Sequence, residues 1–145
     1  MSSTRVLKFG GAALRDGDSI RRAFDLVQRH GGPRPIVVVS AAAGVTGLLE
    51  ALADGAGDAA AVRIRHRMLL SQLDLPGDLL DGFLRELGLL LAAREASDRW
   101  RDHLLSFGER MAARLVAAAF RARGRLATPV DAWDLGFRTD RKSVV

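Results

Sequence analysis

The sequence predicts an α/β fold built on a largely parallel sheet with helices on both faces. A short apolar run at residues 6–9 and a continuous β-branched run at residues 36–39 are typical of strands buried in such a sheet. Between them, apolar side chains recur at helical spacing: Ile20, Ala23, Phe24 and Val27. A strand–helix–strand unit of this length implies two parallel strands joined by a right-handed crossover.

Capping residues and glycines mark where these elements begin and end. Asp18 and Ser19 are good helix-capping residues, so we expect the first helix to start there and to stop at residues 31–32, a glycine pair. Pro33 and Pro35 then separate the helix from the second strand. A further helix is expected from Gly44, ending in the small polar residues 54–58.

The middle of the chain is predicted to be helical. One apolar stripe covers residues 62–73 and a second covers residues 79–87, with a Pro-Gly break between them. Two more helical sections are expected, one around Trp100 and one ending near Gly124. Residues 126–130 are then predicted as a third strand, placed at an edge or a strand end by Pro129.

Composition excludes several classes of protein. With 145 residues, 48% of them hydrophobic, the chain fits one domain with a real core. It has no cysteine and only three scattered histidines, so we predict no disulfide and no metal site. The net charge of +5 is carried by dispersed arginines without interleaved aromatic residues, so nucleic acid is not an expected partner. No signal-type or membrane-spanning apolar stretch is evident, which predicts a cytoplasmic protein without a membrane partner.

The first strand ends in a lysine and a glycine pair. Lys8 is the only lysine before residue 142 in a chain whose positive charge is otherwise carried by arginine. Gly10 and Gly11 allow close backbone approach, and backbone N–H groups beside a compact ammonium suit a phosphate. The alternative is a solvated lysine next to an ordinary glycine turn.

A loop of small residues follows the second predicted strand. Ser40 and Thr46 flank it, at the carboxyl end of a strand, where ligands bind in open α/β sheets. Their two hydroxyls could hold a carboxylate or a phosphate, or they could only cap the next helix. Farther along, His66 lies within an apolar stripe, which favours a core or helix–helix contact over a catalytic base.

A third polar cluster is Ser106-Phe107-Gly108-Glu109. The serine and the glutamate have the spacing of a capping box, which would mark a helix start. In a functional role, Glu109 would instead accept hydrogen bonds from an ammonium or hydroxyl group of a substrate. The two roles compete for one carboxylate.

Taken together, these segments resemble the amino-terminal part of aspartate kinase, within the amino-acid kinase family. Four stretches carry the resemblance in the right order and spacing: residues 6–11, residues 37–46, residues 106–109, and residues 130–140 with their Val-Asp-Ala and Gly-Phe-Arg-Thr-Asp runs. The resemblance covers residues 5 to 140. It implies an incomplete amino-acid kinase-like fold, with residues 1–140 forming the amino-terminal part of the kinase domain.

The resemblance also implies a reaction, the transfer of the ATP γ-phosphoryl group to the side-chain carboxylate of aspartate, which opens lysine, threonine and methionine biosynthesis. Lys8 would be the catalytic and phosphate-binding lysine, and Gly10 and Gly11 would bind the phosphates. Ser40, Thr46 and Glu109 would hold aspartate. ATP is then a co-substrate with Mg²⁺, and the parent enzyme is expected to be a homo-oligomer.

The chain departs from the family pattern in three places. The family usually has Thr-Ser after the glycine pair, whereas this chain has Ala12 and Ala13. The family's kinase domain also continues well beyond residue 140, so we expect this fragment alone to be inactive. Residues 141–145 do not follow the family and match a translated sequencing adapter, which predicts a non-native tail. A non-catalytic amino-acid-binding or interaction module derived from a kinase remains the alternative.

Overall fold

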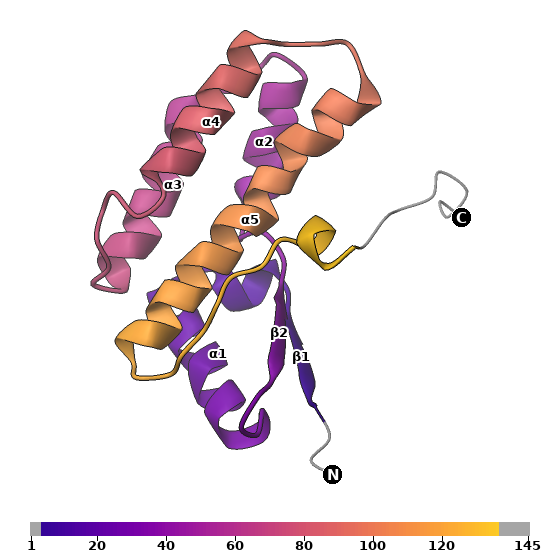
Figure 1. The fold of residues 1–145 in the computed structure, drawn as a ribbon. Coiled ribbons are helices and arrows are strands. Elements are labelled where there is room, and N and C mark those ends of the chain that lie inside the picture. The colour runs from indigo at the N-terminus through magenta and orange to yellow at the C-terminus, as the bar shows by residue number, and fades with distance from the viewer. Residues whose placement is uncertain (1–3, 137–145) are drawn as a thin grey trace.

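The computed structural model describes residues 4–136 of the chain. Two strands and five helices follow one another (Figure 1), and two short 3₁₀ turns lie at residues 11–14 and 132–135. The strands and helices are β1 (Val6–Phe9), α1 (Gly17–His30), β2 (Ile36–Val39), α2 (Val45–Ala53), α3 (Ala59–Gln72), α4 (Asp81–Ala92) and α5 (Asp98–Ala122). None of the helices within residues 4–136 has the length and apolar character needed to cross a membrane.

The two strands form the predicted parallel pair. Val6 lies opposite Ile36, and the register runs without a break to Phe9 opposite Val39. Leu7, Phe9 and the alternate residues of β2 pack into the core, whereas Val6, Ile36 and Val38 are 64%, 52% and 45% exposed. Figure 1 shows the helices gathered on one side of the strands. The α/β class with a parallel sheet is confirmed, and the described helices cover one of its two faces.

Helix α1 begins two residues earlier than predicted. Its N-cap is Asp16, whose carboxylate accepts a hydrogen bond from the Ser19 N–H at 2.7 Å. Hydrogen bonds from Ser19, together with the neighbouring Arg15, lower the pKa of Asp16 to about 2. Asp18 and Ser19 therefore lie inside the first turn. The predicted stop is confirmed, since Gly31 donates its N–H to the Val27 carbonyl at 2.8 Å.

Helix α5 corrects a second boundary. The two expected helical sections are one helix of 25 residues, capped by Ser97, whose Oγ accepts from the Trp100 N–H at 3.2 Å. Ser106 and Glu109 lie in its interior, so the capping-box interpretation is wrong. Ser106 donates its hydroxyl to the His103 carbonyl at 2.6 Å instead. The helix continues because its buried stripe is unbroken through Leu104, Phe107, Met111 and Leu115.

The predicted third strand does not form. Residues 126–130 have no strand structure, and the sheet in the described part of the chain contains β1 and β2 alone. Pro129 has no N–H to donate to a ladder, and Arg121 donates to the Ala127 carbonyl at 2.6 Å. The segment runs back along α5 as an extended connection (Figure 1), with Leu126 94% exposed.

The core lies among the helices and extends to the inner face of the sheet, and it contains one histidine. The rings of Phe24 on α1 and Phe120 on α5 meet edge to face at 5.2 Å. His66 on α3 is fully buried, and its Nδ1 lies 2.8 Å from the Val62 carbonyl oxygen. Its Nε2 has no hydrogen-bond partner among the described residues. The structure confirms His66 as a core residue.

Burial makes His66 a source of pH-dependent stability. Desolvation, with a smaller contribution from the Arg65 charge, lowers its pKa below the ordinary 6.5. The unfolded chain therefore binds more protons than the folded chain below that pH, so the free energy of unfolding should fall as pH decreases from about 6.5. Urea denaturation between pH 8 and pH 5 should show this loss, and His66→Leu should remove it. The exposed His30→Gln serves as a control that should keep the loss, and an unchanged slope in His66→Leu would contradict the assignment.

Candidate functional site

The carboxyl ends of β1 and β2 lie side by side. The Ser40 N–H donates to the Phe9 carbonyl at 3.1 Å, which extends the parallel ladder one residue beyond β2. Gly10 and Ser40 therefore begin their loops at the same edge of the sheet. In open parallel sheets this edge is where ligands bind.

Gly11, the second glycine after β1, packs closely against the loop after β2. Gly10 is extended, and the 3₁₀ turn that follows is closed by a hydrogen bond from the Ala13 N–H to the Gly10 carbonyl at 3.0 Å. A Cβ on Gly11 would lie 3.1 Å from the Ala41 carbonyl oxygen. A Cβ at position 11 would therefore be tight against this loop, and glycine lets the two loops approach closely without that contact.

The loop between β2 and α2 is held by its backbone and by one arginine that the sequence analysis did not select. Gly44 caps α2 with φ of 85°, and no side chain forms a cap hydrogen bond there. Ser40 and Thr46 are therefore not helix caps. Arg65 on α3 donates to the Ala43 carbonyl at 3.1 Å and to the Arg15 carbonyl at 2.5 Å, which ties this loop to the turn after β1.

Helix α5 reaches the same loop at Gly108. A Cβ on Gly108 would lie 2.8 Å from the Ala41 Cβ and 3.3 Å from a methyl carbon of Leu49. Glu109 is the next residue on the helix and is exposed. The structure therefore brings together the three segments that the sequence singled out: the glycine pair, the small-residue loop and the turn of α5 that carries Glu109.

The polar side chains of these segments are available to a ligand. Lys8, Thr46 and Glu109 are exposed and Ser40 is half-buried. Within residues 4–136, the side chains of these four residues form no hydrogen bond or ion pair with the protein, including with one another. The fold thus brings the segments that carry these residues into contact and leaves the four polar groups unpaired within the described residues.

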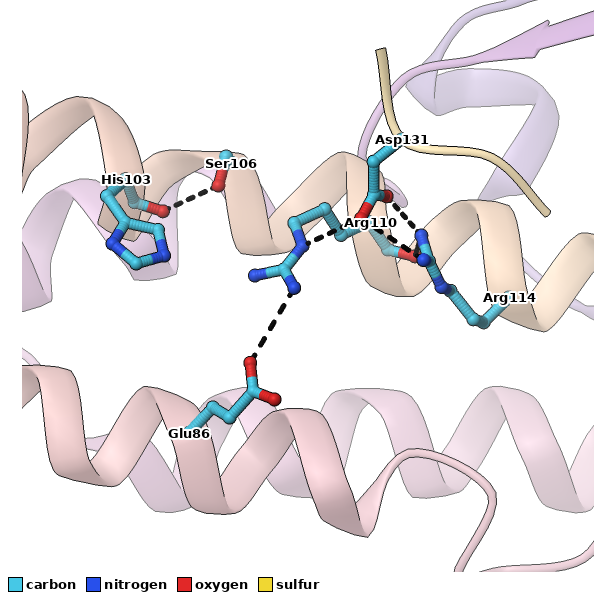
Figure 2. Close-up of polar contacts among 6 residues, drawn as sticks. All are labelled: Glu86, His103, Ser106, Arg110, Arg114 and Asp131. Atoms are coloured by element: carbon cyan, nitrogen blue, oxygen red, sulfur yellow. Dashed lines mark hydrogen bonds and ion pairs between the residues drawn. The ribbon is translucent and has the colours of Figure 1, made fainter. Parts of the chain in front are cut away.

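A buried ion cluster pins the chain after α5 to the helix. Asp131 is 7% exposed and accepts from Arg110 Nε at 3.3 Å and from Arg114 Nη2 at 3.1 Å (Figure 2). Arg110 also lies 3.6 Å from a carboxylate oxygen of Glu86 on α4. Its guanidinium stacks within 5.0 Å of three aromatic rings: Phe83, Phe107 and Trp133. The Val-Asp-Ala motif therefore has a structural role, which its sequence alone did not indicate.

Two shallow hollows of the described surface are not lined by Lys8. One is lined by α3 residues around Met68, and the other lies against Trp100, His103, Ser106 and Trp133. No group of three or more histidine and acidic side chains within residues 4–136 could hold a metal ion. The candidate site is therefore an open edge of the sheet.

An α/β protein with a lysine and a glycine turn at the carboxyl end of a parallel strand belongs to a class that can bind phosphate groups. The sequence model described as "Amino acid kinase family" matches residues 3–145, and the chain belongs to that family. Residues 137–145, which include the predicted tail and most of the Gly-Phe-Arg-Thr-Asp run, lie outside the described residues.

The relatives it resembles are aspartokinases. Lysine-sensitive aspartokinase 3 of Escherichia coli is 34% identical over 134 residues, a match covering 85% of this chain and 30% of that protein. Aspartokinase 1 of Arabidopsis thaliana, a chloroplastic protein, is 28% identical over 151 residues, covering 94% of this chain and 26% of that protein. The crystal structure of E. coli aspartokinase III with aspartate and ADP superposes with a TM-score of 0.74 at 30% identity, covering 83% of this chain and 29% of that one. The chain thus spans less than a third of the length of these relatives, and the incomplete amino-acid kinase fold is confirmed.

The ion cluster gives a stability prediction. Replacing Asp131 with Ala leaves the guanidinium groups of Arg110 and Arg114 partly buried without a counter-charge, since their side chains are 14% and 23% exposed. We expect Asp131→Ala to lower the free energy of unfolding by about 2 kcal/mol. Asp134→Ala, on an exposed position three residues away, should change it by less than about 0.5 kcal/mol. Urea denaturation checks both, and equal small effects would show that the cluster does not pin the segment.

Proposed function

We propose that this chain is the amino-terminal part of an aspartate kinase, which transfers the ATP γ-phosphoryl group to the side-chain carboxylate of aspartate. The observation that carries the proposal is the meeting of three segments around Ala41, each of which presents an unpaired polar group. The similarity to aspartokinases along most of the chain supports the same conclusion. The product would enter lysine, threonine and methionine biosynthesis.

In this proposal the end of β1 and the glycine pair after it bind the phosphate groups of ATP. The exposed ammonium group of Lys8 would neutralise charge on the transferring phosphoryl oxygens, since phosphoryl transfer depends on positioning and charge compensation more than on covalent chemistry. Gly10 and Gly11 would let the phosphates approach the backbone. Mg²⁺ would arrive with the nucleotide, bound to its phosphate oxygens.

The second and third segments would hold the amino acid. The hydroxyls of Ser40 and Thr46 can donate hydrogen bonds to a carboxylate, and the Glu109 carboxylate can accept them from an α-ammonium group. The two hydroxyls would therefore bind a carboxylate of the amino acid, and Glu109 would bind its α-ammonium group. A structure of E. coli aspartokinase III, similar to this chain, contains aspartate and ADP.

The proposal predicts that nucleotide affinity depends on Lys8. Lys8→Met removes the only ammonium group among residues 4–136 and should weaken binding of MgATP to the chain about tenfold or more, measured by titration calorimetry. Arg63→Met on an exposed face of α3 removes the same charge elsewhere and should leave the affinity unchanged. Equal affinities in the wild type and in Lys8→Met would overturn the assignment of Lys8.

Ala12 and Ala13 favour one rival, a non-catalytic amino-acid-binding module. These residues replace the two hydroxyls that the family usually places after the glycine pair. Calorimetry separates the two functions, because a binding module takes up aspartate without any affinity for MgATP. A chain that binds aspartate alone would support the module, and one that binds MgATP through Lys8 would support the kinase.

The missing hydroxyls also give a kinetic prediction. In a chimera whose residues 4–136 replace the matching segment of E. coli aspartokinase III, the double substitution Ala12→Thr with Ala13→Ser should raise turnover several-fold, because each hydroxyl can add a hydrogen bond near the phosphates. A coupled assay for ADP release measures it. The exposed Ala56→Ser is the control, and unchanged turnover in the double variant would show that the hydroxyls have no role in this background.

A further inference from the structure

A single methyl group fills the crossing between α5 and the loop after β2. Ala41 is 4% exposed and faces Gly108, which is itself buried in the middle of α5. A Cβ at position 108 would lie 2.8 Å from the Ala41 Cβ, closer than two such atoms approach in proteins. The crossing therefore holds one methyl group and has no room for a second.

Neither side of this contact can yield by a side-chain rotation. Both Cβ atoms are fixed to their backbones, so a second methyl would push the helix and the loop apart. On the far side, Val45 and Leu49 of α2 already contact the same point at 3.6 Å and 3.3 Å from the position of that Cβ. On the near side, the Ala41 carbonyl is in close contact with Gly11. A displacement of the loop would therefore change its distance from Gly11 and from α5.

The two residues at the crossing are sequence neighbours of two residues proposed to bind the amino acid. Ser40 precedes Ala41 in the loop, and Glu109 follows Gly108 on α5. The separation of the Gly108 and Ala41 backbones thus fixes the separation of the hydroxyl and carboxylate sides of the proposed site. A glycine in the middle of a helix costs about 1 kcal/mol relative to alanine, and the packing at position 108 gives a reason for that cost.

We propose that Gly108 is a positioning residue, which with Ala41 sets the spacing between Glu109 and the Ser40–Thr46 loop and so the affinity for aspartate. This inference rests on the proposed function, because it assigns the spacing to recognition of the amino acid. Gly108 itself contacts no substrate in this scheme. Its effect passes through the position of the helix turn that follows it.

The test moves the single methyl group between the two positions. Gly108→Ala places two methyl groups at the crossing, Ala41→Gly leaves none, and the double variant has one again on the opposite side. Aspartate affinity is measured on the chain by titration calorimetry, and thermal unfolding is followed by circular dichroism. Gly88→Ala on α4, where a Cβ meets nothing within 4 Å, is the matched control for adding a methyl to a helical glycine.

We expect Gly108→Ala to weaken aspartate binding about tenfold and Ala41→Gly to weaken it about threefold, with the double variant within about twofold of the wild type. Gly88→Ala should bind as the wild type does. If Gly108→Ala does not fold, Ala41→Gly and the double variant carry the test, because neither adds a second methyl.

Two results distinguish this inference from the proposed function. A wild-type chain that takes up no aspartate overturns the proposed function and the positioning role together. A wild-type chain that binds aspartate, with variants that change the unfolding temperature but not the affinity, overturns the positioning role alone. Failure of the double variant to recover the affinity lost in Gly108→Ala has the same meaning.

Discussion

The close packing of backbones around Ala41 is the constraint on which the candidate site depends. Gly11 approaches its carbonyl oxygen, Gly108 approaches its methyl group, and Val45 and Leu49 enclose the crossing from α2. A Cβ at position 108 would lie too close to the Ala41 methyl group, and a Cβ at position 11 would be tight against the Ala41 carbonyl oxygen. Three segments separated by about thirty to seventy positions in the sequence therefore share one small space.

Polar contacts hold the surrounding elements in place around this apolar crossing. Arg65 connects α3 to the backbones on either side of the crossing, through Ala43 and Arg15. Asp131 connects the chain after α5 to Arg110 and Arg114, which lie one and five residues after Glu109 on the same helix. Arg65, Arg110 and Arg114 thus bind the protein to itself.

Local sequence patterns predicted the two strands, a helix end and a buried residue. They did not predict features that depend on contacts between distant segments. The strands at residues 6–9 and 36–39, the helix stop at Gly31 and the buried His66 follow from periodicity and glycine chemistry. Ser106 and Glu109 matched a capping box, but the continuous apolar stripe of α5 was the stronger influence. Residues 126–130 had strand composition, yet no strand pairs with them in the described structure. The roles of Arg65 and Asp131 depend on contacts between distant segments and could not be predicted from the sequence. The close packing of α5 against Ala41 had one signal in the sequence, the glycine at position 108 within a helical pattern.

Packing constrains some positions of the candidate site and leaves others, such as Ala12, open to substitution. Ala12 is exposed, and Ala12 and Ala13 both lie in a 3₁₀ turn whose closing hydrogen bond joins backbone atoms. The fold therefore does not require alanine at position 12, and a hydroxyl there would have access to a ligand. Positions 11 and 108 are different, because a Cβ would be tight against the Ala41 carbonyl oxygen at position 11 and would lie too close to the Ala41 methyl group at position 108. Packing thus restricts the residues allowed at positions 11 and 108. At position 12, beside the proposed phosphate site, packing sets no such limit, and the choice of residue depends on its interaction with a ligand. Under the proposed function, the loss of hydroxyls at positions 12 and 13 would affect phosphoryl transfer and leave the residues proposed to hold the amino acid unchanged.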